Sequence, residues 1–147
     1  WRWVQEPANS GVLLNVQGKD IIFPHCVEAH LMNGRAGDIV LMGKGAAITV
    51  KDSTYTVVSE ENRYLAIQKF EESSEKPAGE WQDLDITLCD RHVNVVLNGQ
   101  TIIDNQPLLG CTGGALWSDP FRPGPIYLQG DHGPVKFRNM VLRPIVK

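Results

Sequence analysis

The chain is built from short segments in which apolar and polar residues alternate, separated by turn residues, and no long stretch has a helical period. Strict alternation over a few residues is typical of a strand with one buried face, whereas a helix repeats every 3.6 residues. About twelve such segments predict an all-β jelly-roll sandwich of two antiparallel sheets. The expected strands are 1–4, 10–16, 26–31, 36–42, 46–50, 54–58, 64–68, 84–89, 92–97, 100–104, 125–129 and 135–142.

The clearest local unit covers residues 84–104. Apolar residues occupy every second position of 84–89, and another alternating run follows at 92–97. Asn98 and Gly99 come next, and this pair is a strong hairpin signal because both residues tolerate positive φ. We therefore expect three antiparallel strands in a meander.

Length and charge narrow the class of protein. With 147 residues the chain has the size of one domain, and its formal net charge is −3. That charge offers no basic surface to a phosphate backbone, so we expect no nucleic-acid partner. No apolar run approaches the ~20 residues of a transmembrane helix, and no signal peptide is present. Removal of a leader would fit a chain that opens inside an expected strand.

Three cysteines, Cys26, Cys89 and Cys111, occur without a CxxC pair. At most one disulfide can form, and one thiol then remains. The count neither requires nor excludes an oxidising compartment. Only surroundings that lower a thiol pKa create a nucleophile, so we expect inert thiols rather than a catalytic one.

The stretch 124–145 carries the densest set of candidate functional groups. A polar Gly-Asp-His-Gly turn separates two alternating runs, which holds His132 between two strands. An aromatic ring, an amide, an imidazole and a guanidinium close together suit a polyhydroxylated ligand better than a lipid. Expected core residues are Ile126, Leu128, Val135 and Phe137, and expected outward residues are Tyr127, Gln129, Lys136 and Arg138.

Strand parity places further polar residues on one face. Glu28 and His30 alternate with apolar residues, and same-face neighbours lie roughly 6.5–7 Å apart along a strand. Both side chains can therefore address one sugar ring. If the strands concerned are neighbours, they form a polar strip that comprises Asn9, Glu28, His30, Asp38, Gln129 and Arg138.

Each candidate also has a purely structural interpretation, because antiparallel sheets alternate polar and apolar residues for solubility alone. Asp38 would then be solvated or cap a turn, His132 would fix its own turn, and Arg138 would pair with a carboxylate. We expect Trp81 to serve in packing. Trp117 lies in a long loop and fits packing and stacking on a sugar equally well.

Metal ligation through the strand that starts near residue 26 meets a geometric obstacle. His25 and His30 are separated by an odd number of residues, so a regular strand points them to opposite sides. Cys26, Glu28 and His30 share a face, but their spacing is too wide for one ion without help from other strands. We expect no metal ligands among the site residues. The sequence does not decide whether loop carbonyl groups bind calcium.

Four ordered segments cover most of the chain: Asn9-Ser-Gly-Val12; Cys26-Val-Glu-Ala-His30 with Ala36-Gly-Asp38; Gly79-Glu-Trp81 with Val96-Leu-Asn-Gly99; and Gly124 to Ile145. The last contains the pattern LQ-x-x-HG-x-V-x-FRN. Together they resemble the 3-keto-disaccharide hydrolase family. The resemblance implies a concanavalin A-like, laminarinase-like jelly roll in a bacterial protein that is exported to the periplasm or cell surface.

Two features depart from the family pattern. Family members usually carry more sequence before the Asn-Ser-Gly motif, including a strand near the C-terminal one. The single domain over 1–147 is therefore expected to lack an N-terminal strand segment or to receive it from a separate segment. An arginine often follows the Asn-Ser-Gly strand, where this chain has Asn15, so a ligand contact through that arginine is not expected here.

The resemblance implies a hydrolase or lyase that cleaves glycosidic bonds of 3-keto-disaccharides or glycosides. The hydrogen at C2 of a 3-keto sugar is acidic, so one base can remove it and expel the C1 substituent. We expect Glu28 or His132 as the base, Asp38 assisting the leaving group, and Arg138 or a divalent cation stabilising the enolate. The cofactor is otherwise left open. Expected substrate contacts are Asn9, His30, Gln129, Arg138, Tyr127 and Trp117.

Two other functional classes remain compatible with the sequence. The same sandwich can serve as a non-catalytic, lectin-like carbohydrate-binding module, because fold does not fix function. An interaction protein whose open sheet edge pairs with another chain is the third possibility. Direct hydrolysis by two carboxylates would require a separation of about 5–5.5 Å or 6.5–9.5 Å, which a sequence does not give.

Overall fold

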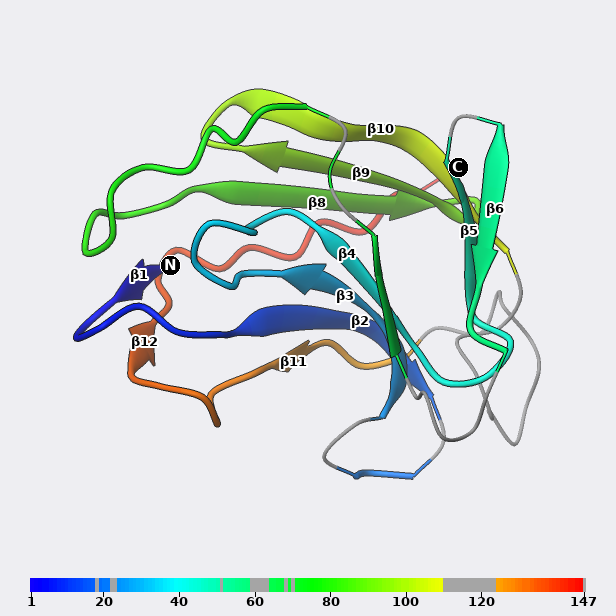
Figure 1. Ribbon diagram of the computed structural model, residues 1–147, viewed down its shortest axis with the longest axis horizontal. Helices are drawn as coiled ribbons and strands as arrows, with labels where there is room; N and C mark the ends of the chain where they lie inside the picture. Colours follow the sequence, from blue (N-terminus) through cyan, green and yellow to red (C-terminus); the bar gives the residue numbers. More distant parts are fainter. Residues whose placement is uncertain are drawn as a thin grey trace.

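The computed structural model describes residues 1–17, 19–21, 24–50, 52–58, 64–67, 69, 71–109 and 124–146, and every regular element in these ranges is a strand (Figure 1). Within this part of the chain, no helix is long and apolar enough to cross a membrane. The strands are β1 (Arg2–Trp3), β2 (Gly11–Gln17), β3 (His25–His30), β4 (Ile39–Met42), β5 (Ala47–Val50), β6 (Ser53–Thr56), β7 (Tyr64–Ile67), β8 (Leu84–Cys89), β9 (His92–Leu97), β10 (Gln100–Leu109), β11 (Tyr127–Leu128) and β12 (Val135–Lys136).

Two five-stranded antiparallel sheets form the sandwich, which confirms the predicted jelly-roll class. One sheet has the order β6-β5-β10-β9-β8 and the other β11-β2-β3-β4-β7, while β1 and β12 pair separately. Figure 1 shows the two sheets as layers, with β8, β9 and β10 above β2, β3 and β4. The core lies between them and is made by alternate residues of both sheets, among them Val27, Ile39, Leu41, Val93, Val95 and Leu97.

The predicted meander is present as β8, β9 and β10. Asn98 and Gly99 both have positive φ, 50° and 83°, as the predicted two-residue hairpin turn requires. β10 runs on to Leu109, five residues beyond the expected end at 104, and its pairing with β9 shifts register twice. Such irregularities depend on the partner strand, so periodicity along one segment does not reveal them.

The C-terminal strands are shorter than expected. Val135 and Phe137 pack against the core as predicted. Ile126 and Leu128 do not: both are exposed, and among the described strands β11 is the outermost of its sheet, with β2 as its partner. The expected strand 135–142 is reduced to β12, which pairs with β1.

A bulge in β2 changes which residues face outward. The register between β2 and β3 shifts between Leu14 and Gln17, and Asn15 has φ 50°. Beyond the bulge, Val16 joins Leu13 in an apolar cluster separate from the main core. Leu13, Cys26, Val40 and Met42 already share this face by regular pairing, so the face of the β3 sheet that points away from the main core carries an apolar cluster rather than a continuous polar strip.

Candidate functional site

The centre of the candidate site is a buried pair of side chains on β3. Glu28 and His30 are two residues apart, so they project from the same face of the strand, as predicted. His30 Nδ1 lies 2.6 Å from Glu28 Oε1, a short contact typical of a hydrogen bond to a carboxylate. Glu28 is 2% exposed and His30 is 8% exposed, so the imidazole is the more accessible member of the pair.

Gly11 provides the space in which this pair meets. It lies on β2 directly opposite His30. A Cβ atom built on Gly11 would come within 2.7 Å of three atoms of the Glu28 side chain, including Oε1. The Glu28 carboxylate therefore rests on a residue that has no side chain. A glycine inside a strand often marks such a close approach, and this signal in the Asn9-Ser-Gly motif would have identified Gly11 from the sequence.

Two residues with amide side chains adjoin Gly11 through the main chain. Asn9 is two residues before it, and Gln129 is bound to it because the Gln129 N–H donates to the Gly11 carbonyl at 3.0 Å. Ser10, which is fully buried, fixes the same segment by donating from Oγ to the Gln129 carbonyl at 2.8 Å. Asn9 Oδ1 and Gln129 Oε1 are buried and have no hydrogen-bond partner among the described residues. Buried polar atoms without a partner are rare in folded proteins, which distinguishes these two oxygens from the other polar atoms of the site.

Asp38 adjoins His30 through the main chain but directs its carboxylate elsewhere. The His30 N–H donates to the Asp38 carbonyl at 2.9 Å. Asp38 Oδ2 is 2.9 Å from Arg35 Nε, and Oδ1 accepts from the Lys69 N–H at 3.1 Å and lies 3.4 Å from Lys69 Nζ. The carboxylate is buried and both of its oxygens have partners. Asp38 is neither solvated nor a free acid beside the pair.

An apolar cluster occupies the rest of this face. Leu13 and Val40 are the cross-strand neighbours of Glu28, one on each side. The cluster consists of Leu13, Val16, Cys26, Val40 and Met42, with Ala66 and Tyr127 packed against it. Tyr127 therefore faces outward from the main core, as predicted, yet packs on aliphatic side chains. Glu28 lies at the boundary between apolar and polar halves of the face.

Cys26 belongs to this apolar cluster and has no nucleophilic character. Its Sγ lies 3.6 Å from the Met42 Sδ. Burial, together with the neighbouring charge of Glu28, raises the pKa of the Cys26 thiol to about 12. A thiol with such a pKa stays protonated at neutral pH, which agrees with the expectation of an inert cysteine.

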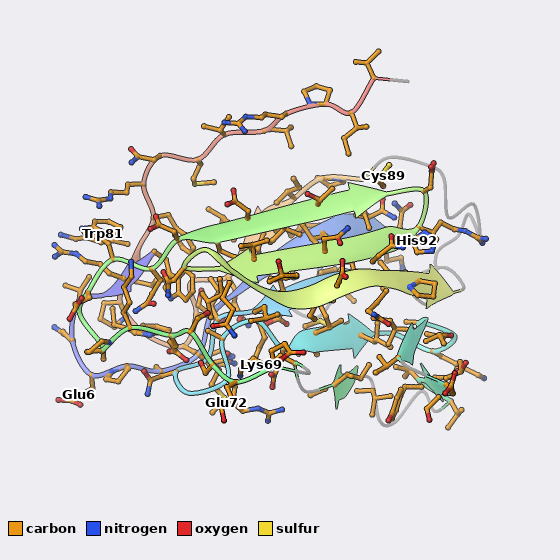
Figure 2. The ribbon with its side chains drawn as sticks, turned by 90° about the horizontal axis from the view of Figure 1, so that it is seen from above. Glu6, Lys69, Glu72, Trp81, Cys89 and His92 are labelled. Atoms are coloured by element: carbon orange, nitrogen blue, oxygen red, sulfur yellow. The ribbon has the colours of Figure 1, made fainter. Side chains whose placement is uncertain are left out.

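Two of the predicted site residues have other partners. His132 is on an exposed turn between β11 and β12, where its Nε2 lies 3.5 Å from Asp131 Oδ2. Arg138 stacks on Trp81, with its guanidinium carbon 3.8 Å from the ring centroid, and Arg2 lies 5.0 Å from the same centroid. Figure 2 shows Trp81 at one end of the molecule. Trp81, for which packing in the core or in a hairpin was expected, thus stacks with two arginine side chains.

The structure therefore brings together only part of the predicted strip. Glu28 and His30 meet opposite Gly11, the Gln129 N–H donates to the Gly11 carbonyl, and Asp38 supports His30 through the main chain, while Asn9 is placed near them only by its position two residues before Gly11. Trp117 lies outside the described residues. Within the described ranges, no group of three or more His, Cys, Asp or Glu side chains is arranged to hold a metal ion.

Comparison with known proteins adds one match. A family model described as the 3-keto-alpha-glucoside-1,2-lyase-like domain matches residues 1–143. No curated protein and no solved structure matches the chain.

Proposed function

Because the chain belongs to the family of 3-keto-alpha-glucoside-1,2-lyase-like domains, we propose that it cleaves 3-keto glycosides by elimination, with His30 as the base and Glu28 as its orienting partner. The observation that carries the proposal is the 2.6 Å contact between His30 Nδ1 and Glu28 Oε1 in a buried site. A carboxylate at Nδ1 fixes the tautomer and orientation of an imidazole and leaves Nε2 to exchange a proton with a substrate.

The chemistry requires one base and a place for the negative charge that develops. His30 Nε2 removes the proton from C2, and the electrons of that bond form an enolate with the C3 carbonyl. The enolate then collapses to regenerate the carbonyl, a C1–C2 double bond forms, and the C1–O bond breaks. The departing oxygen receives a proton from the imidazolium, so the base returns to its starting state.

Neighbouring residues fit supporting roles in this scheme. The amides of Asn9 and Gln129 lie beside Gly11, and their free oxygens suit the hydroxyl groups of a sugar. We assign Asp38 to the support of β3 and β4 rather than to the leaving group, because Arg35 and Lys69 already neutralise its carboxylate. That neutralised carboxylate also argues against a two-carboxylate hydrolysis by Glu28 and Asp38.

The test compares two histidines on a 3-keto-glucoside. His30→Ala should lower kcat by roughly 10²–10⁴-fold, the usual contribution of a general base. His92→Ala is the matched control, since His92 lies on β9 with its Nδ1 3.0 Å from the Asp90 carbonyl oxygen, away from β3. Glu28→Gln should also lower kcat while the protein stays folded. Equal activity of the two histidine variants would refute the assignment.

A second readout separates elimination from hydrolysis. Substrate deuterated at C2 should react more slowly, because that bond breaks during elimination and remains intact in direct hydrolysis. If the protein binds glycans but turns over no 3-keto glycoside, the same face has the lectin-like role instead. In that case Asn9→Ala and Gln129→Ala would weaken binding while Glu28→Gln would not abolish it.

A further inference from the structure

Three basic side chains lie on the outer face of the small sheet formed by β1 and β12: Arg2, Lys136 and Arg138. Trp3 is buried and Phe137 packs against the core, so the residues that alternate with them point away from the core. Arg2 is directly opposite Lys136 in the pairing of the two strands. Arg138 follows two residues after Lys136, and same-face neighbours are roughly 6.5–7 Å apart along a strand. The three cationic groups therefore come from adjacent positions of one surface.

The indole ring of Trp81 gathers the two arginines, at one end of the molecule in Figure 2. The guanidinium carbon of Arg138 lies 3.8 Å from the ring centroid, and that of Arg2 lies 5.0 Å from it. Both distances are within the ~6 Å reach of a cation–π contact. A guanidinium group that stacks on a ring keeps its N–H donors at the edge of its plane, so these donors remain free for a further partner.

No carboxylate neutralises these cations within the described part of the chain. The acids nearest in sequence to Trp81 are Glu80, which is exposed and takes no part in the ion pairs of that part, and Asp83, whose Oδ2 lies 3.6 Å from Lys76 Nζ. Arg2 Nε is buried and has no hydrogen-bond partner among the described residues. Such donors are rare in folded proteins, and like charges on one surface repel each other. Because the formal net charge is −3, a general excess of basic residues does not explain the group.

The donors define the class of ligand. Two guanidinium groups and one ammonium group offer N–H donors and positive charge but no acceptor. A sulfate or phosphate group matches them, because its terminal oxygens carry negative charge and point in different directions, so each cation can contact one oxygen. A carboxylate has two oxygens in one plane and suits a single guanidinium group better. Neutral hydroxyl groups would leave the positive charges unbalanced, and three cations on an acidic chain are too few for a nucleic-acid backbone.

We propose that Arg2, Lys136 and Arg138 form a binding site for the sulfate or phosphate group of an esterified sugar. Trp81 holds the two guanidinium groups in place, and each of the three cations contacts an oxygen of the bound group. The site shares no residue with the proposed catalytic pair. The choice of a sugar as carrier rests on the proposed function, whereas the site for the oxyanion does not.

A titration followed by nuclear magnetic resonance tests the site. The four tryptophans have one indole N–H each, and Trp81→Phe identifies the signal of Trp81. Glucose 6-sulfate and glucose 6-phosphate should shift this signal along a curve that saturates, because the oxyanion contacts the guanidinium groups stacked on the ring. Sodium chloride keeps all samples at one ionic strength, so screening is the same throughout. Glucose should cause no shift. An equal shift with glucose, no shift with either ester, or a shift that never saturates would overturn the proposal.

Substitutions of two exposed arginines show which charge matters. Arg138→Ala should weaken binding of both esters at least tenfold, because it removes a stacked guanidinium group and its charge-assisted hydrogen bonds. Arg143→Ala is the matched control, since Arg143 is exposed on the same C-terminal segment and does not lie on the Trp81 ring. It removes the same charge and should change the affinity less than twofold. Equal losses in the two variants would indicate a general effect of net charge and overturn the site.

Arg138→Lys separates charge from geometry. It keeps the positive charge but loses the planar set of donors, so it should also weaken binding of both esters. An affinity equal to that of the unsubstituted chain would contradict the role of the stacked guanidinium group.

Inorganic sulfate distinguishes the carrier of the oxyanion. It should bind through the same residues, with an affinity no higher than that of glucose 6-sulfate. If inorganic sulfate binds and neither ester does, the site takes free ions and the sugar carrier is wrong. The binding curves do not depend on turnover, so saturable binding of the esters by a chain that cleaves no 3-keto glycoside would leave the site in place while the proposed elimination fails.

Discussion

Replacing Gly11 by alanine adds one methyl group at the centre of the site. Gly11 has no positive φ and sits in regular pairing with His30, so its main chain accommodates alanine. The new Cβ would lie within 2.7 Å of three side-chain atoms of Glu28. The main chain of β2 is held on both sides, so the carboxylate is the group that must move, and it loses its contact with His30.

The size of the effect follows from two opposing terms. Loss of a hydrogen bond to a charged group costs about 1.5–3 kcal/mol. Alanine in a strand is more favourable than glycine by roughly 0.5–1 kcal/mol. We therefore expect Gly11→Ala to destabilise the protein by about 1–2 kcal/mol, which lowers Tm by roughly 3–8 °C in a chain of this size. In the proposed mechanism, Gly11→Ala also lowers kcat, because His30 loses its orienting partner Glu28.

A double-mutant cycle with Glu28→Ala provides the decisive assay. With Glu28 truncated, the methyl group at position 11 meets no carboxylate, so Gly11→Ala should stabilise the protein by roughly 0.5–1 kcal/mol. The coupling free energy from urea denaturation should be about 1.5–3 kcal/mol. If the loss of unfolding free energy in the double variant equals the sum of the losses in the two single variants to within about 0.5 kcal/mol, the clash is not with Glu28 and the reasoning fails.

Three further predictions concern neighbouring groups. Asp38→Asn should cost about 3 kcal/mol in urea denaturation, because it leaves Lys69 without its buried counter-charge; a loss below about 1 kcal/mol would contradict this. Burial raises the pKa of the Glu75 carboxyl above its ordinary value of 4.5, so its contribution to stability is present at low pH and is lost as the pH rises through the folded pKa. The Tm of the Glu75→Gln variant should therefore rise relative to the Tm of the unsubstituted chain as the pH is raised from 4 to 7. A difference in Tm that does not change with pH would refute the assignment. The Cys26 thiol, with a pKa of about 12, should resist iodoacetamide at pH 8 until the protein is unfolded, and peptide mapping that finds rapid labelling of the folded protein would show the cysteine to be accessible.

Local pattern was sufficient for the all-strand character of the chain and for the pair at the centre of the site, but not for the extent of every strand. The alternation along 26–31 put Glu28 and His30 on one face, because same-face spacing in a strand is a property of the backbone itself. Asn98 and Gly99 likewise predicted their hairpin, since positive φ is a property of those residue types. The resemblance read from four ordered segments agrees with the family match over residues 1–143.

Two further contacts could not be obtained in this way, because they depend on residues far away in the chain. Arg138 stacks on Trp81, and Asp38 is neutralised by Lys69, a residue 31 positions away. The bulge at Asn15 and the short β11 depend on their partner strands, and beyond the bulge Val16 joins the apolar cluster of the outer face.

The amino-acid order by itself determined the all-β class, the face shared by Glu28 and His30, and the family. Only the tertiary structure decided that Gly11 makes room for the Glu28 carboxylate, that Lys69 lies beside Asp38, and that Arg138 stacks on Trp81. The physical reason is range: strand parity and turn conformation are set by neighbouring peptide units, whereas contacts between side chains are set by how distant strands are ordered and registered.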